Sequence, residues 1–252
     1  MSNQAAKGVS IRPVTALPFF KAGDDVAAAI ISAMMASQDR LSDGDVVVVA
    51  QKIVSKAEGR AVKVSSVDAG TQAHEVAALT DKEPKIVELA LRESSEVVRA
   101  HTGVLIMRHT TGQVLANAGI DASNVEKIDG EEAVLLWPKN PDASAQKIRM
   151  DLQAAFGARI AVVISDSLGR AWRMGTAGTA IGVAGMSPLR DRRGEHDLFG
   201  RELQATVIGV ADEIAAAASL VIGEAAEGSP VAIVTGAAYT PSETGGIEEI
   251  VR

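Results

Sequence analysis

The sequence predicts an α+β fold on the strength of three observations. Continuous apolar runs, which are typical of buried strands, occur at residues 46–50 and 231–234, and five apolar residues followed by Ser165 make up residues 160–165. Short strands separated by Gly-containing turns follow one another between residues 96 and 120, as in a series of hairpins. Separate segments with helical spacing flank both groups. Hairpins combined with independent helices favour α+β over a regular βαβ array.

The composition limits the partners that the protein can have. With 252 residues, the chain can form one large domain or two small ones. Hydrophobic residues make up 47% and aromatic residues 3%, so we expect an aliphatic core and no aromatic surface for stacking nucleic-acid bases. The net charge of −7 gives no overall attraction to nucleic acid or to an anionic membrane.

The chain contains no cysteine, which excludes disulfides, cysteine-ligated zinc, iron–sulfur clusters and thiol catalysis. Its first 13 residues lack the apolar core of a signal peptide. The longest weakly polar segment, residues 205–223, carries Asp212 and Glu213 and therefore does not suit a membrane span. We expect a soluble cytoplasmic protein.

The N-terminal part predicts a tail, a loop and a helix. Residues 1–10 are expected to be a flexible tail, and residues 13–20 a loop shaped by Pro18. Asp25 precedes apolar residues with helical spacing, which predicts a helix that begins there and runs to about Ser37.

Basic residues directly follow the strand at residues 46–50. Lys52 and Lys56 could hold phosphates there as point charges, or they could simply face the solvent. Neither of the familiar glycine-rich phosphate loops is present. Helices are predicted at residues 71–79 and 84–93, the second with Pro84 in its first turn.

Two polar stretches follow apolar strands. Residues 117–124 (NAGIDASN) form either a plain loop or a ligand loop, in which Asp121 would bind a hard metal ion and Asn124 would hydrogen-bond. Asp166 and Ser167 follow the strand at residues 160–165, where the backbone is expected to leave the sheet. There they could start a turn or form a binding site.

The remaining segments complete the α+β pattern. A short strand at residues 134–137 precedes a helix at residues 143–156, which Gly157 closes. The Gly-rich residues 174–188 predict tight loops or close backbone approach, and they suggest a lid. A basic cluster and an Ala-rich helix at residues 204–222 follow. The arginines of this cluster form either a solvated face or a positive pocket; they are Arg190, Arg192, Arg193 and Arg201.

Five motifs in order resemble the F420:γ-glutamyl ligase family. They are LPFF, VAQKIVSKAEGR, NAGIDASN, ISDSLGRAWR, and DLFGREL followed by VADEIAAAASLVIGE. The resemblance covers residues 11–236, which could divide into two subdomains, and leaves residues 237–252 as a polar C-terminal tail. The chain stops before the nitroreductase-like domain that is fused to this module in some members, so we expect the stand-alone form.

The resemblance implies a two-part α+β arrangement that pairs into an intertwined homodimer. It implies an enzyme that adds L-glutamate to coenzyme F420-0 through an acyl phosphate and then extends a γ-linked glutamate chain. GTP would be the co-substrate, with two Mg²⁺ or Mn²⁺ ions and assistance from K⁺. The alternatives are an inactive nucleotide- or deazaflavin-binding protein, and the same chemistry on a different acceptor acid.

The resemblance also implies the site residues. The metal ligands would be Asp121, Asp166, Ser167 and Glu224, of which Asp121 and Asp166 would be catalytic. The nucleotide would be contacted by Leu17, Pro18, Phe19, Phe20, Gln51, Lys52, Lys56, Asn124, Ile222, Gly223, Ala225, Ala226, Glu227, Gly228 and Ser229. Ser167 stands where the family commonly has Thr and keeps the hydroxyl. Gln51, Lys52 and Lys56 would lie on a loop after the strand at residues 46–50. Gln51 and Lys52 stand where some members carry small hydroxyl residues.

The chemistry of these side chains agrees with the resemblance. The four metal ligands are all oxygen donors, which suits Mg²⁺ or Mn²⁺ and not zinc. Such ions would bridge nucleotide phosphates and offset charge during phosphoryl transfer to a carboxylate. The histidines lie outside the motifs and are expected to be structural or at the surface; they are His74, His101, His109 and His196.

Overall fold

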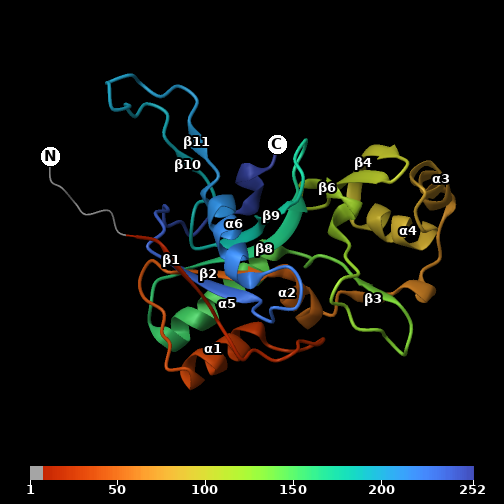
Figure 1. The fold of residues 1–252 in the computed structure, drawn as a ribbon, viewed down its shortest axis with the longest axis horizontal. Helices are drawn as coiled ribbons and strands as arrows, with labels where there is room; N and C mark the ends of the chain where they lie inside the picture. The colour runs from red at the N-terminus through yellow and green to blue at the C-terminus, as the bar shows by residue number, and fades with distance from the viewer. Residues whose placement is uncertain (1–7) are drawn as a thin grey trace.

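The computed structural model describes residues 8–252 and confirms the α+β class. Its central sheet has the strand order β1-β12-β2-β8-β9 (Figure 1). These strands span Ser10–Pro13 (β1), Val231–Thr235 (β12), Val46–Ala50 (β2), Ala161–Gly169 (β8) and Thr176–Ala184 (β9). Strands β2 and β8 run parallel, with Val46 opposite Ala161, and the other pairs in this sheet are antiparallel.

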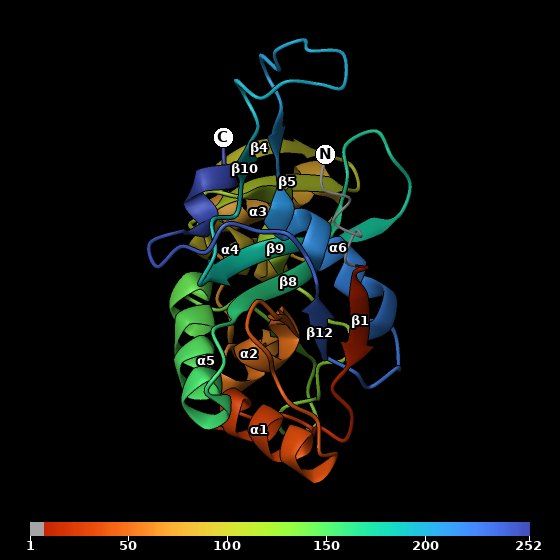
Figure 2. The same cartoon turned by 90° about the vertical axis from the view of Figure 1, so that its left-hand side faces the viewer.

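Helices cover both faces of this sheet (Figure 2). One face packs against α1 (Val26–Ala36), α2 (Gln51–Ala57) and α5 (Pro141–Phe156), and the other against α6 (Val210–Ile222). Alternate valines of β2 enter the two cores, because successive side chains of a strand point to opposite faces. This explains why the strand is a continuous apolar run. No helix among the described residues is long and apolar enough to cross a membrane.

A second, smaller lobe lies beside the sheet (Figure 1, right). Its three-stranded meander contains β4 (Ser94–His101), β5 (Val104–His109) and β6 (Val114–Ala116), and it packs against α3 (Thr71–Thr80) and α4 (Pro84–Arg92). The short strands β3 (Ala61–Lys63) and β7 (Ala133–Leu135) pair antiparallel and lead into and out of this lobe. The 3₁₀ turns η1 (Val64–Ser66) and η2 (Asn117–Gly119) also belong to it.

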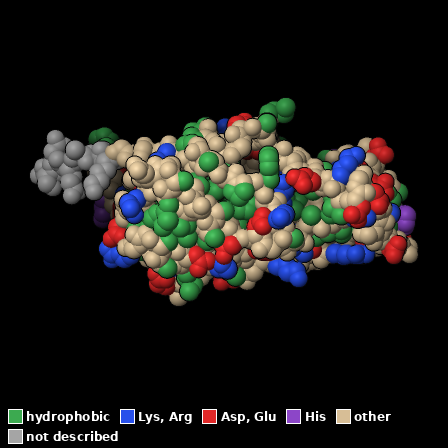
Figure 3. All heavy atoms as spheres, turned by 90° about the horizontal axis from the view of Figure 1, so that it is seen from below, with side chains coloured by type: hydrophobic (Ala, Val, Ile, Leu, Met, Phe, Trp, Pro, Cys, Tyr) green, Lys and Arg blue, Asp and Glu red, His purple; other side chains and the backbone are tan. Residues whose placement is uncertain are grey.

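Between β9 and α6 the chain forms an arm that projects from the body (Figures 1 and 2). Its base is the two-residue pair β10 (Arg190–Asp191) and β11 (Val207–Ile208). Leu198 and Phe199 in this arm are 99% and 96% exposed. On the face in Figure 3, acidic and basic side chains are interspersed.

The helix ends that the sequence predicts at Asp25, Pro84 and Gly157 are confirmed. Asp25 caps α1 and accepts a hydrogen bond from the Ala28 N–H at 2.9 Å. Pro84 begins α4, and Gly157 ends α5 with a left-handed φ of 69°. Of the predicted N-terminal tail, residues 1–7 lie outside the described part, whereas Ser10 begins β1.

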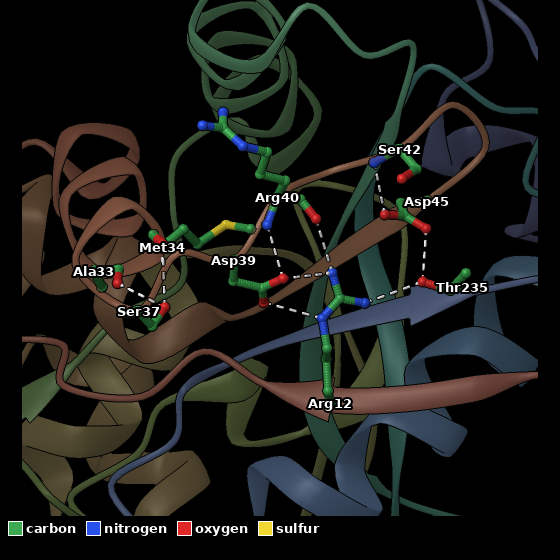
Figure 4. Close-up of polar contacts among 9 residues, drawn as sticks. All are labelled: Arg12, Ala33, Met34, Ser37, Asp39, Arg40, Ser42, Asp45 and Thr235. Carbon is green, nitrogen blue, oxygen red and sulfur yellow. Dashed lines mark hydrogen bonds and ion pairs between the residues drawn. The ribbon is translucent and has the colours of Figure 1, made fainter.

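The edge strand β1 is fixed by a polar cluster around Arg12 (Figure 4). The Arg12 guanidinium donates to both carboxylate oxygens of Asp39, at 3.0 and 3.2 Å, and to the Thr235 hydroxyl at 3.1 Å. The Thr235 hydroxyl in turn donates to Asp45 at 2.6 Å. The cluster therefore ties β1 and β12 to the connection that leads into β2.

Three predicted boundaries are corrected. Asp166 and Ser167 do not lie beyond the sheet: after a bulge between Ile164 and Ser165, β8 continues to Gly169. Gln51 and the two lysines after β2 belong to helix α2, not to a loop. The Ala-rich helix begins at Val210, because residues 204–209 complete the arm.

The predicted Gly-rich lid is wrong, because most of that stretch forms β9. A Cβ on Gly178 would lie 2.5 Å from the Ala215 carbonyl oxygen of α6. A Cβ on Gly182 would lie 2.6 Å from the Pro141 carbonyl carbon of α5. Glycine is therefore used here for close packing of helices on both faces of the strand, which fits the predicted close backbone approach.

The C-terminal residues 237–252, expected to form a tail, pack against the body. They contain the 3₁₀ turn η3 (Ile247–Ile250), in which Ile247 is 4% exposed. The Asp142 carboxylate of α5 accepts hydrogen bonds from the Val183 N–H at 2.7 Å and the Ile247 N–H at 3.0 Å. This segment therefore packs against α5 and β9.

Candidate active site

A cavity of about 620 Å³ opens beside the end of β2 and residues 165–167 of β8, near α2 and the C-terminus of α6. Its wall includes every residue predicted to contact a nucleotide: Leu17, Pro18, Phe19, Phe20, Gln51, Lys52, Lys56, Asn124, Ile222, Gly223, Ala225, Ala226, Glu227, Gly228 and Ser229. Asp166, Ser167 and Glu224 also line it, whereas Asp121 lies behind Lys52. The fold thus gathers the predicted residues around one cavity, and their individual roles stay predictions.

Asp166 is a partly buried carboxylate on β8. Its Oδ2 accepts a hydrogen bond from the Trp137 indole N–H at 2.8 Å, and its Oδ1 accepts one from the Ser167 N–H at 2.8 Å. Burial raises the pKa of Asp166 to about 6, although the two hydrogen bonds and the charge of Lys52 oppose this rise. The negative charge of Asp121 contributes to it, which places the two carboxylates within electrostatic reach.

Asp121 has the opposite character. Its carboxylate is ion-paired with the Lys52 ammonium and accepts hydrogen bonds from the Ser123 N–H at 2.6 Å and hydroxyl at 3.0 Å. Burial alone would raise the pKa of Asp121, but these partners outweigh it and hold the pKa below its ordinary value. The Asp121 N–H donates to the Leu135 carbonyl at 3.1 Å, and the Asp121 carbonyl accepts from the Leu135 N–H at 2.8 Å. These two bonds fix the loop.

Helix α2 contributes the polar side chains of Gln51, Lys52 and Lys56 to the cavity wall. Because α2 begins directly after β2, Lys52 in its first turn reaches the loop that carries Asp121. Gln51 is 1% exposed, and its Oε1 accepts a hydrogen bond from the Ser55 hydroxyl at 2.7 Å. Within residues 8–252 the Gln51 amide nitrogen has no hydrogen-bond partner. It is therefore a buried donor available to a ligand.

Two loops meet across the cavity. The Asn124 amide donates to the Ala225 carbonyl at 3.1 Å, which joins the Asp121 loop to residues 223–230. In the second loop, the Glu227 carboxylate packs against Gly223 and accepts a hydrogen bond from the Ala225 N–H at 2.8 Å. Backbone N–H groups lower the pKa of Glu227. Glu227 therefore shapes the loop, while Glu224 is exposed at the rim.

The side chains suit a divalent cation that also binds a substrate. Among the described residues, no three His, Cys, Asp or Glu side chains lie close enough to hold an ion by themselves. Glu224 therefore does not join Asp121 and Asp166 in one cluster. Mg²⁺ is commonly held by one or two carboxylates together with phosphates and water, so the two aspartates and the Ser167 hydroxyl fit such an ion.

Other polar residues are not assembled at this cavity. His74, His101 and His196 are exposed, and His109 is 1% exposed in the smaller lobe, as the sequence predicts. None of the arm arginines lines the cavity. Arg192 pairs with Glu195, and Arg193 pairs with Asp191 and lowers the pKa of Asp191 to about 2.

Sequence reasoning missed Trp137. It appeared only as the last residue of a short strand, before Pro138, where an apolar residue is usually part of the core. The structure buries it completely and directs its indole N–H at Asp166. Val125, Glu126 and Ser219, which also line the cavity, had no local signal of their own.

Comparison with known proteins identifies the family of this chain. Residues 15–236 match the family described as F420-0:Gamma-glutamyl ligase. The chain is 46% identical to "Coenzyme F420:L-glutamate ligase" of Methanothermobacter thermautotrophicus, over 97% of this chain and 96% of that protein. It is 42% identical to proteins of the same name from Methanocaldococcus jannaschii, over 94% of this chain and 91% of the relative, and Archaeoglobus fulgidus, over 97% and 93%.

The fold and the site define an α+β protein with a cavity that is lined by Lys52 and Asp166, with Asp121 ion-paired to Lys52, and the comparisons place it among ligases. The chain belongs to the F420-0:gamma-glutamyl ligase family.

Proposed function

We propose that this protein joins L-glutamate to coenzyme F420-0 with GTP as co-substrate, and then extends a γ-linked glutamate chain. The observation behind this proposal is that the nucleotide-contacting residues implied by the family line one cavity together with Asp166 and Ser167. The names of relatives that are 38–46% identical over most of the chain support the same activity.

The cavity offers different surroundings to the two ends of a nucleotide. Leu17, Phe19 and Phe20 form an apolar part of its wall that suits a base. The free Gln51 amide can donate a hydrogen bond to an acceptor on that base or its sugar. Lys52 and Lys56, which also line the cavity, supply positive charge for phosphates. The nucleotide would therefore lie with its phosphates toward Asp121 and Asp166.

The proposed reaction has two steps. A carboxylate oxygen of the acceptor attacks the γ-phosphorus of GTP, so that GDP leaves and an acyl phosphate forms. The glutamate amine then attacks the acyl carbon, inorganic phosphate leaves, and the nitrogen loses a proton as the amide forms. Lys52 would offset the charge on the transferred phosphoryl group, while the partly buried site around Asp166 limits hydrolysis of the acyl phosphate.

Divalent ions would supply the remaining positive charge at the phosphates. We propose Asp121, Asp166 and Ser167 as their protein ligands, with Glu224 at the rim holding a second Mg²⁺ or Mn²⁺ through the nucleotide and water. K⁺ is proposed as an activator.

We also propose that the protein is a homodimer. The arm projects from the body and exposes two large apolar side chains, Leu198 and Phe199, almost completely. Apolar side chains on such an extension suit contact with a second copy. Light scattering should give the mass of a dimer for the natural chain and of a monomer for a Leu198→Ser, Phe199→Ser variant.

Mass spectrometry of the products tests the proposed activity. The chain is incubated with F420-0, GTP, glutamate and Mn²⁺, and glutamylated products are measured together with GDP and phosphate. Asp166→Asn should abolish product, whereas Asp129→Asn, which changes a 78%-exposed aspartate paired with Lys63, should not. GTP binding without product would indicate the inactive binder. Phosphate release only with another acid would indicate a different acceptor.

A further inference from the structure

Trp137 contacts both acidic segments of the site. Its indole N–H donates to the Asp166 carboxylate at 2.8 Å. The other contact is with Gly119, two residues before Asp121, where a Cβ would lie 2.5 Å from the indole Nε1 and Cε2 atoms. Gly119 also has a φ of +73°, which disfavours any side chain. The indole therefore fills the space between the strand that carries Asp166 and the loop that carries Asp121.

The backbone beside Trp137 fixes the same loop. Leu135, two residues earlier, exchanges backbone hydrogen bonds with Asp121 at 2.8 and 3.1 Å. One short segment therefore holds Asp121 by its backbone and Asp166 by a side-chain N–H. Any shift of this segment would move the two carboxylates relative to each other.

The smaller lobe holds the indole in place. The Arg60 guanidinium donates to the Trp137 carbonyl at 2.8 Å and pairs with Glu93 at 2.5 Å. The His109 ring lies against the indole with a centroid distance of 5.0 Å and an interplanar angle of 53°. Because Trp137 is 0% exposed, these contacts leave it little freedom to rotate.

We propose that Trp137 is a positioning residue, which sets the orientation of the Asp166 carboxylate and its separation from Asp121 for binding a nucleotide-bound divalent cation. The inference rests on the proposed function. A buried indole N–H needs an acceptor and a carboxylate in such surroundings needs donors, so each group restricts the other. The Trp137 N–H occupies one lone pair of Oδ2 and the Ser167 N–H occupies one of Oδ1, so one lone pair on each oxygen is left for the ion.

The first test replaces the indole and keeps an aromatic ring. Trp137→Phe removes the N–H but keeps a ring against His109 and Gly119. Mn²⁺ affinity is measured from the electron paramagnetic resonance signal of free Mn²⁺ in the presence of GTP. Partners that orient a metal ligand typically change affinity by about 10–100-fold, and we expect a weakening in that range. We expect kcat to fall and the KM for glutamate to stay the same.

The second test leaves Trp137 in place. The chain has two tryptophans, and Trp172 is fully exposed. In a Trp172→Phe variant, the remaining fluorescence comes from Trp137, and Mn²⁺ should quench it with saturation because the indole contacts Asp166. Adding Asp166→Asn should abolish this saturable quenching. Trp172→Phe alone is also the matched control and should keep natural Mn²⁺ affinity and activity.

The outcomes separate the inference from the proposed function. Natural Mn²⁺ affinity and kcat in Trp137→Phe, with a normal natural enzyme, would overturn the positioning role and leave the ligase function standing. If Trp137→Phe does not fold, the quenching in Trp172→Phe decides: absence of saturable quenching overturns the inference. A natural chain that forms no product and binds no Mn²⁺ would overturn both.

Discussion

Lys52 and Asp121 form an ion pair that joins the first turn of α2 to the loop after η2. The same ammonium donates to the Ser123 hydroxyl at 2.8 Å. Lys52 lines the cavity together with Asp166, whereas Asp121 does not, so the one lysine is shared between the Asp121 carboxylate and the space that would hold phosphates. Its charge therefore affects both the acidic groups and the bound nucleotide.

Replacing Lys52 with Gln should reduce the ligase rate by about 100-fold or more, as is typical when a charged donor at a phosphoryl or oxyanion site is lost. Asp121 would lose the partner that keeps its pKa low, and the phosphates would lose a positive charge. Product formation under saturating GTP measures the effect. Lys147→Gln, at an exposed lysine on α5, is the matched control. Near-natural turnover in Lys52→Gln would exclude the proposed role.

The strands were predictable where burial on both faces dictates the residues. Four consecutive valines at the start of β2 have few other interpretations, and its bounds match the prediction. Strand β9 was not predictable, because Gly178 and Gly182 are typical of loops when read locally. Glycine is needed at these two positions because α6 and α5 approach the strand closely. This approach is a tertiary contact and leaves no periodic pattern in the sequence.

The gathering of the predicted residues around one cavity could be predicted only through resemblance. Phe19, Lys52 and Ser229 are far apart in the chain, and nothing in their local patterns indicates that they share one cavity. Trp137 escaped prediction for a different reason. A tryptophan at the end of an apolar strand is typical of a core, and its polar atom becomes informative only when the fold places Asp166 beside it.

The raised pKa of Asp166 predicts a pH-dependent cost to stability in the chain without metal. The native state holds this proton up to a pH of about 6, whereas the unfolded state releases it near 3.8. The native state therefore binds more protons in this interval, and the contribution of Asp166 to the free energy of unfolding falls as pH rises. Asp166→Asn should accordingly melt at a higher temperature than the natural chain at pH 7.

This advantage should shrink as the pH is lowered from 7 to 4, because Asp166 is then protonated in the native state and partly protonated in the unfolded state. Melting is followed by circular dichroism with a chelator present. Asp129→Asn, at an exposed position, should show no comparable trend. A stability difference for Asp166→Asn that does not change between pH 4 and pH 7 would contradict the origin of the raised pKa in burial.

Gly182→Ala should destabilise the fold by about 1–3 kcal/mol, the usual cost of forcing extra volume into a packed core. The added Cβ would meet the Pro141 backbone at 2.6 Å, and backbone atoms cannot move aside as a flexible side chain can. Urea denaturation measures the free energy of unfolding. Gly169→Ala, at the end of β8, is the control, since a Cβ there would meet nothing within 4 Å. Equal stability of the two variants would be inconsistent with the packing of α5 on β9.

The C-terminal segment should loosen when Glu243 is replaced with Gln. The Arg149 guanidinium of α5 donates to both Glu243 carboxylate oxygens at 2.6 Å, and Arg149 is 6% exposed. Hydrogen bonding from Arg149 lowers the pKa of Glu243, so its stabilising effect is present above the ordinary value of 4.5 and is lost as pH falls below it. At pH 7, amide exchange across Ile247–Ile250 should therefore be faster in Glu243→Gln than in the natural chain.

Glu248→Gln, on the same segment but without an ion pair among the described residues, should change exchange little. Equal exchange in the natural chain and Glu243→Gln would mean that Asp142 and the buried Ile247 hold the segment without help from the ion pair.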